Sequence, residues 1–263
     1  MSRISGKLEQ GRGFIPFVTA GDPDIGTSLD ICLKLAELGA DVIELGVPFS
    51  DPMADGPTIQ RSSQRALEQG VTLGHVIDLA RSFRKRSAVP LVLFTYFNPV
   101  MRLGVERFTE LASDAGIDGV LLTDVIEDEA AELSRRFGAN KIDLISLVAP
   151  TTSDERLEKI CAHARGFVYA VSRAGVTGAQ TELSAASERL VRRTRKSTDL
   201  PIAVGFGIST REQVEQVWQY ADAAVVGSAI VAEIEKNFGD AVGSVERFVR
   251  GLLPSVAKIG AET

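Results

Sequence analysis

The stretch FIPFVTAGDP, residues 14–23, joins a short apolar strand, Phe14–Thr19, to the turn that follows it. In an open doubly wound α/β sheet, the turn after the first strand carries a GxGxxG motif that binds a dinucleotide. The turn TAGDP, residues 19–23, does not fit that motif. This argues against the open sheet and favours its main alternative, a closed β/α barrel.

The same unit, an apolar strand followed by an amphipathic helix, recurs along the chain without a linker. The predicted strands are Phe14–Thr19, Asp41–Gly46, Leu91–Tyr96, Gly119–Asp124, Asp143–Val148, Phe167–Val171, Ile202–Gly205 and Ala223–Gly227. The predicted helices are Ser28–Leu38, His75–Arg84, Val105–Ala115, Glu127–Phe137, Asp154–Ala164, Ala185–Lys196, Arg211–Tyr220 and Gly243–Val256. Strands that are apolar on both faces and alternate with helices indicate a parallel sheet covered by helices.

We therefore predict an α/β fold, a (β/α)8 TIM barrel, with extra short helices at Thr58–Gln69 and Ala229–Phe238. The 263 residues are close to the roughly 250 that are typical of such a barrel, so we expect one domain over residues 1–263.

The composition is that of an ordinary soluble globular protein, with 44% hydrophobic and 24% charged residues. No apolar run approaches the roughly 18 residues of a membrane span, and the first residues, MSRISGK, lack the apolar middle of a secretory signal. We expect a cytoplasmic protein without a membrane partner. The net charge is −6 and no basic stripe alternates with aromatic residues, so we expect no nucleic-acid partner.

The chain has few residues in the positions that several classes of catalytic site require. The two histidines, His75 and His163, fall in predicted helices away from the strand ends, which disfavours a metal cluster or a Ser/His/Asp triad. Cys32 and Cys161 also fall in helical patterns, which indicates buried thiols. No lysine lies at a strand end where it would form a Schiff base. If the protein makes or breaks a carbon–carbon bond, we expect carboxylate acid/base catalysis, without an imine and without a metal.

Polar residues gather where the predicted strands end, and that end of a β/α barrel carries function. These residues are Thr19, Asp22, Glu44, Asp55, Tyr96, Asn98, Asp124, Tyr169, Ser172 and Arg173. At the opposite end, Asp41, Asp118 and Asp143 precede strands and are interpreted as structural turn or capping residues.

Glu44 is the most unusual of these polar residues. Alternation along its strand places Val42 and Glu44 on one face and Ile43 and Leu45 on the other. Burying an ionised carboxylate costs several kcal/mol unless it is paired or its pKa rises. Glu44 is therefore either a member of a buried ion pair or a tuned acid/base.

Two glycine turns follow the last two strands, Gly205–Ser209 (GFGIS) and Gly227–Ala229 (GSA). In β/α barrels, phosphate often binds between these loops at the amino end of a short extra helix, so we favour phosphate binding over ordinary tight turns. The segment Ser172–Leu183 exceeds the usual two to six residues of a βα loop. It is predicted to be a lid, with an ordinary long surface loop as the alternative.

The chain resembles the tryptophan synthase alpha subunit family over nearly its whole length. The motifs that carry the resemblance are residues 16–23 (PFVTAGDP), 44–60 (ELGVPFSDPMADGPTIQ), 96–99 (YFNP), 172–178 (SRAGVTG), 205–209 (GFGIS) and 227–231 (GSAIV). The resemblance implies retro-aldol cleavage of indole-3-glycerol phosphate to indole and glyceraldehyde 3-phosphate, in the last steps of L-tryptophan biosynthesis. It implies that Glu44 is the general acid/base and that Asp55 holds the indole N–H.

The resemblance also implies further site residues. Substrate-binding positions are Phe17, Tyr96, Tyr169, Thr177, Gly178, Phe206, Gly207, Gly227 and Ser228. The expected walls of the indole pocket are Phe17, Phe94, Leu121, Val148 and Phe206, with ordinary core packing as the alternative for each. Asp124 is expected to couple with Thr177 when the lid closes, and Arg173 extends from the lid toward a bound anion.

By the same resemblance, the partner is a beta subunit that carries pyridoxal phosphate in an αββα assembly, and this chain itself needs no cofactor. The partner would contact Asp51, Pro52, Met53 and the segment from Asn98 to Arg102. The chain departs from the family pattern in two places. Val125 follows Asp124 where relatives place a proline. The amino terminus is short, so the sequence does not decide whether the helix that usually lies below the barrel is present.

Two other functions remain open from the sequence. One is a stand-alone indole-3-glycerol phosphate lyase that releases indole without a partner. The other is a barrel that binds a phosphate metabolite without turnover, which the presence of both Glu44 and Asp55 disfavours.

Overall fold

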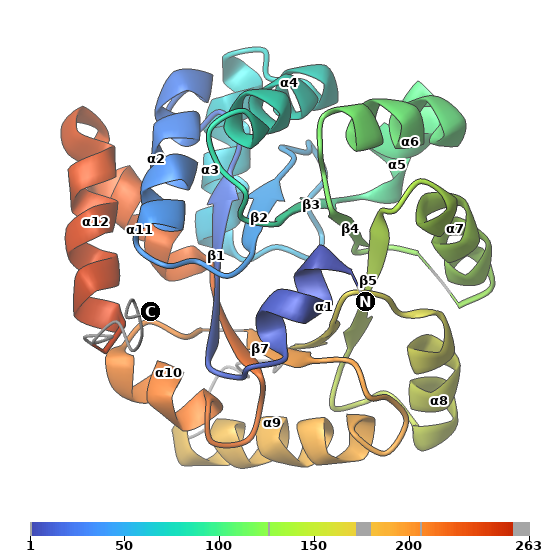
Figure 1. The fold of residues 1–263 in the computed structure, drawn as a ribbon. Helices are drawn as coiled ribbons and strands as arrows, with labels where there is room; N and C mark the ends of the chain where they lie inside the picture. Colours follow the sequence, from blue (N-terminus) through green and yellow to red (C-terminus); the bar gives the residue numbers. More distant parts are fainter. Residues whose placement is uncertain (1, 126, 172–179, 206, 255–263) are drawn as a thin grey trace, which may run out of the picture.

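A computed structural model describes residues 2–125, 127–171, 180–205 and 207–254. Within these ranges the strands form one closed parallel barrel, in which each strand pairs with the next and β8 pairs with β1 (Figure 1). The strands are β1 (Gly13–Thr19), β2 (Ile43–Gly46), β3 (Leu91–Thr95), β4 (Gly119–Leu122), β5 (Asp143–Val148), β6 (Val168–Val171), β7 (Ile202–Gly205) and β8 (Ala223–Val226). The predicted (β/α)8 barrel is confirmed.

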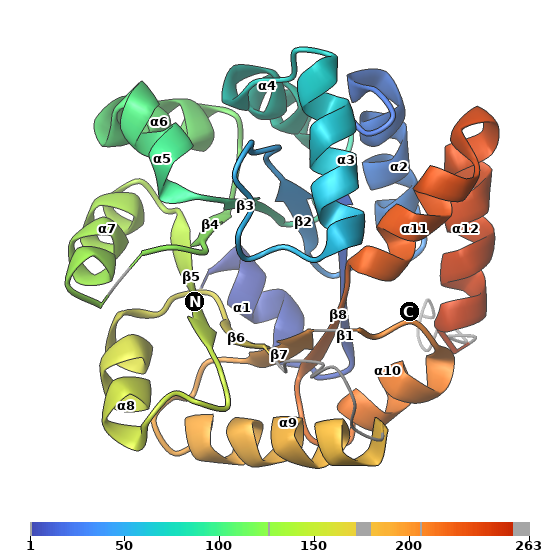
Figure 2. The same cartoon turned by 180° about the vertical axis from the view of Figure 1, so that it is seen from behind.

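The helices surround the barrel on its outer side, except α1, which lies across the amino-terminal end of the barrel (Figures 1 and 2). They are α1 (Arg3–Leu8), α2 (Ile25–Glu37), α3 (Pro57–Glu68), α4 (Leu73–Arg84), α5 (Phe97–Leu103), α6 (Val105–Asp114), α7 (Glu127–Ala139), α8 (Asp154–His163), α9 (Gln180–Thr194), α10 (Arg211–Val217), α11 (Ser228–Lys236), the 3-10 turn η1 (Phe238–Asp240) and α12 (Ala241–Leu252). The two extra helices predicted from the sequence are present as α3 and α11.

Helix α5 was not predicted. It follows β3 directly, so the strand ends at Thr95 and Tyr96 occupies the N-cap of the helix. The Tyr96 side chain does not cap the helix; instead, the carboxylate of Asp124 accepts a hydrogen bond from the backbone N–H of Phe97 at 2.7 Å. A cap supplied from a distant part of the chain leaves no local signal in the sequence.

The predicted lid is shorter than expected. Helix α9 begins at Gln180, so residues 180–183 of the expected loop are helical. The segment Gln180–Thr194 contains no glycine or proline to stop a helix, which is the physical reason for the earlier start. Residues 172–179 lie outside the described residues.

The helix that the sequence left open below the barrel exists as α1. Ser2 caps it through a reciprocal capping box with Ser5. Ile4 and Leu8 are fully buried and belong to the cluster that fills the barrel interior. The short segment therefore contributes a hydrophobic plug at the amino-terminal end of the strands.

The core has two shells, as alternation along the strands requires. One shell fills the barrel and includes Ile15, Val42 and Val92. The other lies between strands and helices and includes Ile43 and Leu45. Val42 and Ile43 thus face opposite sides of the barrel wall, as predicted.

Two aspartates before strands have structural roles, as predicted. Asp41 accepts a hydrogen bond from the backbone N–H of Phe14 at 2.8 Å, and Asp118 accepts one from Leu91 at 2.9 Å. Asp118 also pairs with Arg84 at 2.6 Å.

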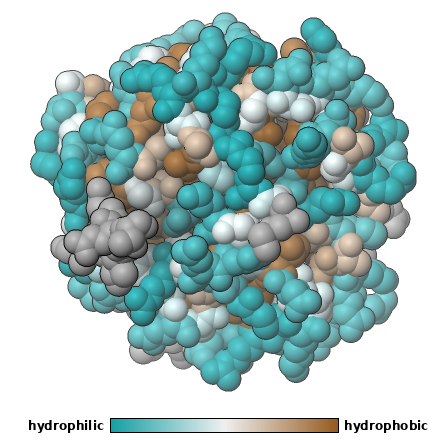
Figure 3. Space-filling view, viewed as in Figure 1, coloured by the Kyte–Doolittle hydropathy of each residue, from teal (hydrophilic) through white to brown (hydrophobic). Residues whose placement is uncertain are grey.

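Figure 3 shows that the face around α1 is mostly hydrophilic, with apolar residues visible between the polar ones.

The histidines and cysteines lie in helices, as predicted. His75 lies in α4 and His163 in α8, and Cys32 and Cys161 are buried free thiols, as expected. Within the described ranges, no helix combines the length and the apolar character needed to cross a membrane.

Candidate active site

Glu44 lies inside the barrel near the carboxyl end of β2. Its register partners are Phe17 on β1 and Val92 on β3, and its side chain is 1% exposed. Among the described residues, its Oε1 atom has no hydrogen-bond partner and its carboxylate forms no ion pair. Of the two interpretations of Glu44, the buried ion pair has no partner among the described residues. The tuned acid/base stays a prediction.

Burial raises the pKa of Glu44 to about 8. The physical cause is the loss of hydration of the charged form, without a compensating cation. At neutral pH the carboxyl group is therefore mostly protonated. A neutral carboxylic acid in an apolar interior can donate a proton and then take one back.

Tyr169 on β6 is the polar neighbour of Glu44 in the interior. Burial, and then the charge of Glu44, raise the pKa of the Tyr169 phenol well above its ordinary value. The hydroxyl lies over Gly205, where an added Cβ atom would be 2.1 Å from the hydroxyl oxygen. Gly205 is therefore required by this close approach, and the phenol stays neutral and aimed at the site.

Asp55 lies in the loop between β2 and α3. Its Oδ2 atom accepts a hydrogen bond from the Tyr96 hydroxyl at 3.1 Å, and that hydroxyl accepts one from the backbone N–H of Ala54 at 2.9 Å. Burial raises the pKa of Asp55 to about 6, although the bond from Tyr96 lowers it. Asp55 is therefore mostly ionised at neutral pH, when Glu44 is mostly neutral.

The two carboxyl groups thus carry opposite protonation states near pH 7. Pairs of titratable groups whose surroundings separate their pKa values are typical of acid/base sites. The ionised member can stabilise developing positive charge, while the neutral member supplies a proton.

Aromatic side chains form the wall next to Glu44. Phe17 packs edge-on against Phe94, with ring centroids 5.4 Å apart. Phe17 also covers Gly46, where an added Cβ atom would lie 2.5 Å from the ring. Leu121 belongs to the same interior cluster. These residues fit the predicted wall of an apolar ligand pocket.

Val148 does not belong to that wall, which corrects the prediction. It packs in the outer shell between strands and helices. Ile145 and Leu147 of the same strand face the interior instead, because side chains alternate along β5.

The candidate phosphate end lies at the start of α11. Gly227 is the N-cap and Ser228 the first helical residue, and no side chain caps this end. Free N–H groups at a helix amino end attract anions. Gly227 also borders the aromatic wall, because a Cβ atom added to it would be 3.4 Å from Cβ of Phe17. Gly207, in the preceding turn, has a positive φ of 69°.

The remaining predicted site residues fall into two groups. Arg173, Thr177, Gly178 and Phe206 lie outside the described residues. Asp124 is exposed and binds the amino end of α5 through Phe97. Its expected coupling with Thr177 stays a prediction.

Comparison with known proteins gives a consistent result. The family model for the tryptophan synthase alpha chain matches residues 5–252. A tryptophan synthase alpha chain from Geobacter sulfurreducens is 47% identical over 262 residues, which cover 97% of this chain and 99% of the relative. One from Caulobacter vibrioides is 50% identical over 230 residues, covering 87% and 84%. The chain belongs to the tryptophan synthase alpha chain family.

Solved structures of this family have the same fold. A chain from the tryptophan synthase a2b2 complex of Pyrococcus furiosus superposes with a TM-score of 0.87 at 41% identity, covering 92% of this chain and 98% of that one. The alpha subunit from Legionella pneumophila gives a TM-score of 0.87 at 34% identity, covering 96% and 97%. Family membership makes the protein a lyase of tryptophan biosynthesis.

A face with exposed apolar side chains lies beside the candidate site of this tryptophan synthase alpha chain. Met53 is 95% exposed and Met101 is 59% exposed, and Asp51 and Asn98 are exposed near them in sequence. The Tyr96 hydroxyl, bonded to Ala54, joins the loop after β2 to the start of α5. Large exposed apolar side chains on a loop and a neighbouring helix, as with Met53 and Met101 of α5, are typical of a protein-binding surface.

Sequence reasoning did not assign a role to Phe49 and Gln60. Phe49 stacks on Tyr96 with centroids 4.7 Å apart, and Gln60 donates a hydrogen bond to the backbone oxygen of Asp55 at 2.9 Å. Both lie within the motif of residues 44–60. That motif was the signal in the sequence, but it could not show which atoms meet.

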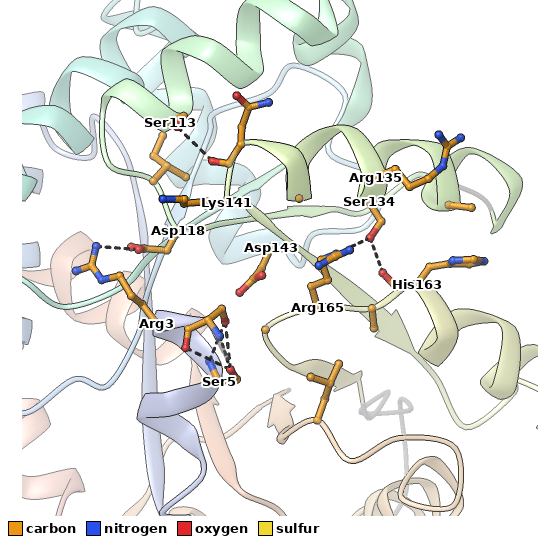
Figure 4. A pocket seen from close by; sticks show the side chains of 18 of the residues that line it. Arg3, Ser5, Ser113, Asp118, Ser134, Arg135, Lys141, Asp143, His163 and Arg165 are labelled. Atoms are coloured by element: carbon orange, nitrogen blue, oxygen red, sulfur yellow. Dashed lines mark hydrogen bonds and ion pairs between the residues drawn. The ribbon is translucent and has the colours of Figure 1, made fainter.

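The cavity drawn in Figure 4 lies at the opposite end of the barrel from Glu44. It measures about 790 Å³ and is lined by α1, the starts of β4 and β5 and the ends of α7 and α8. Several of its polar groups bind one another: Arg3 pairs with Asp118 at 2.9 Å, and Ser134 donates to the backbone oxygen of His163 at 2.7 Å. Among the described residues, Oδ2 of Asp143 has no hydrogen-bond partner. Position in the barrel and this internal pairing favour a structural role.

Proposed function

We propose that this alpha chain cleaves indole-3-glycerol phosphate to indole and glyceraldehyde 3-phosphate. The observation that carries the proposal is Glu44, a buried carboxyl group whose pKa of about 8 keeps it protonated at neutral pH beside an aromatic wall. Family membership and the uncapped amino end of α11 support it, because the substrate has both an indole ring and a phosphate.

The cleavage needs one proton delivered and one removed. Protonation of indole C3 by Glu44 turns the ring into an electron sink. The resulting carboxylate removes the proton of the neighbouring glycerol hydroxyl, and an aldehyde forms as the bond to C3 breaks. The electron pair of that bond returns to the ring, which restores indole, and Glu44 ends protonated again.

Asp55 would act on the other side of the ring. As C3 is protonated, positive charge develops at the indole nitrogen. An ionised Asp55 that accepts a hydrogen bond from the indole N–H stabilises this charge. The Tyr96 hydroxyl bond orients the carboxylate for that contact.

The remaining parts of the substrate have matching positions. Phe17, Phe94 and Leu121 would enclose the indole ring, and the amino end of α11 at Gly227 and Ser228 would hold the phosphate. The proposal includes Gly207 in the phosphate site and Tyr169 as a neutral donor beside Glu44. It also includes Thr177, Gly178, Arg173 and Phe206 in the closing loop and substrate site.

We also propose a beta subunit as the partner, in an αββα assembly. The exposed Met53 and Met101, with Asp51, Pro52 and Asn98, form the surface that would meet it. Pyridoxal phosphate would belong to that partner, and the alpha chain would use no cofactor of its own. A contact at this surface acts directly on the loop that carries Asp55.

The test is indole release from indole-3-glycerol phosphate by the purified chain, with and without a tryptophan synthase beta subunit. We expect slow release by the isolated chain and faster release in the complex. Equal rates, with no joint elution in size-exclusion chromatography, would favour a stand-alone lyase. Substrate binding without indole in either condition would favour a binding barrel.

A further inference from the structure

Gln60 connects the first turn of α3 to the loop that carries Asp55. Its Nε2 atom donates to the backbone oxygen of Asp55 at 2.9 Å and to that of Pro52 at 3.4 Å. The backbone N–H of Asp55 itself donates to the oxygen of Pro52 at 3.2 Å. One side chain therefore holds both ends of the short turn from which the Asp55 carboxylate projects.

The helix α3 is itself fixed to the carboxyl end of β1. The hydroxyl groups of Thr19 and Ser62 are hydrogen-bonded at 2.7 Å in a buried position. One turn further along α3, Arg65 forms a bidentate ion pair with the fully buried Asp22, with Nε to Oδ1 and Nη2 to Oδ2 both at 2.8 Å. A bidentate Arg–carboxylate pair fixes orientation as well as distance.

The same arginine ties α3 to α11. Its Nη1 atom donates to Oε1 of Glu235 at 2.8 Å, and its guanidinium lies 5.3 Å from the ring centroid of Phe238. Figure 2 shows α3 and α11 side by side at this end of the barrel, and they are packed against each other. Arg65 thus joins the turn after β1, α3 and the helix whose amino end is the candidate phosphate site.

We propose that Gln60 and Arg65 are positioning residues for Asp55. Arg65 fixes α3 relative to β1 and α11, and Gln60 transmits that fixed position to the loop. The loop needs such support because its tip, at Met53, is 95% exposed. This proposal rests on the proposed function, since the position of Asp55 matters for the reaction assigned to it.

The first test compares Gln60→Ala with Gln64→Ala. Both glutamines are exposed on α3, but Gln64 donates only to Glu68, at 3.0 Å, and so provides a matched control. We expect Gln60→Ala to lower kcat for indole release by roughly tenfold to a hundredfold, with KM changed less than about threefold, because a misplaced catalytic group loses rate. Gln64→Ala should behave as the wild type.

The second test compares Arg65→Gln with Arg61→Gln. Arg61 also pairs with Glu235, at 2.7 Å, but within the described ranges no hydrogen bond or ion pair joins it to Asp22, which pairs with Arg65. We expect a loss of kcat only in Arg65→Gln, with partial recovery in Arg65→Lys, which keeps the charge but loses the bidentate geometry. If circular dichroism shows that Arg65→Gln does not fold, the comparison of Gln60→Ala with Gln64→Ala tests the proposal.

A third readout separates positioning from general damage. A loosened loop exposes Asp55 to water, so the acid limb of the pH profile should move to lower pH in Gln60→Ala. Partial unfolding would lower the active fraction without moving this limb. Wild-type kcat and an unmoved limb in Gln60→Ala would overturn the proposal.

Amide hydrogen exchange provides a test without any substrate. In the full chain, Gln60→Ala should exchange the amides of Ala54 and Asp55 at least about tenfold faster than Gln64→Ala. Equal exchange in the two variants would refute the positioning role. An absence of indole from the wild type would instead refute the proposed function, so the two failures are distinguishable.

Discussion

The hydroxyl of Tyr96 donates to Oδ2 of Asp55 at 3.1 Å, so the end of β3 directly fixes a carboxylate of the loop after β2. Burial and the charge of Asp55 raise the pKa of Tyr96 to about 12, so this hydroxyl keeps its proton across the working pH range. A partly buried carboxylate stays ionised more readily when a neighbouring hydroxyl keeps its proton and donates a hydrogen bond to it.

Replacing Tyr96 by Phe removes that donor. Because the hydrogen bond lowers the pKa of Asp55, its loss should raise that pKa further above about 6. The acid limb of kcat/KM for indole release should move to higher pH by about one to two units, since a bond to a charged group contributes roughly 1.5–3 kcal/mol. Gln60→Ala should move the same limb in the opposite direction. A Tyr96→Phe profile that overlays the wild type would show that this bond does not control Asp55.

The stability of the fold should depend on the ionisation of Glu44. Its pKa in the folded state, about 8, is above its unfolded value of 4.5. Its contribution is therefore fully present below pH 4.5 and is lost as the pH rises through about 8. Relative to Glu44→Gln, the wild-type free energy of unfolding should fall by up to about 1.4 kcal/mol per pH unit in that window.

Urea unfolding of both proteins between pH 5 and 9 measures this difference, with the exposed Glu110→Gln as the control. A difference between wild type and Glu44→Gln that stays constant with pH would mean that Glu44 titrates normally.

The close approach of Tyr169 to Gly205 predicts a specific coupling. Gly205→Ala places a methyl group 2.1 Å from the phenol oxygen, so we expect a loss of about 1–3 kcal/mol in the free energy of unfolding. Tyr169→Phe removes the oxygen but leaves the ring, whose nearest carbon is 2.7 Å from the added methyl group, so the double variant should recover only part of the loss. A double-mutant cycle by thermal unfolding checks this, and strictly additive effects would contradict it.

Much of the fold could be predicted because the decisive signals are local. Each strand is a short apolar run, and alternation alone places Val42 and Glu44 on one face. Alternation does not say which face is inward. The inward direction of Glu44 could be predicted because Glu44 lies in a motif that matched a known family. Val148 lies in no such motif, and its side chain was predicted to face the barrel interior, whereas it packs between strands and helices.

The contacts that organise the candidate site could not be predicted from the sequence. Asp124 caps α5, and Arg65 binds Asp22, across long separations in the chain. Such pairs depend on where the closed barrel brings two loops together, and no local pattern encodes them. Gln60 illustrates the same limit, because it was visible in a motif but its bond to Asp55 was not.

The central claim is that the protonated Glu44 performs the proton transfers of indole release. The most direct measurement is the single-turnover rate of indole release from indole-3-glycerol phosphate by wild type and Glu44→Gln, in the presence of a beta subunit and with folding checked by circular dichroism. We expect a loss of about 10²–10⁴-fold in the folded variant, the usual contribution of a general acid/base. A folded Glu44→Gln protein that releases indole at the wild-type rate would contradict it.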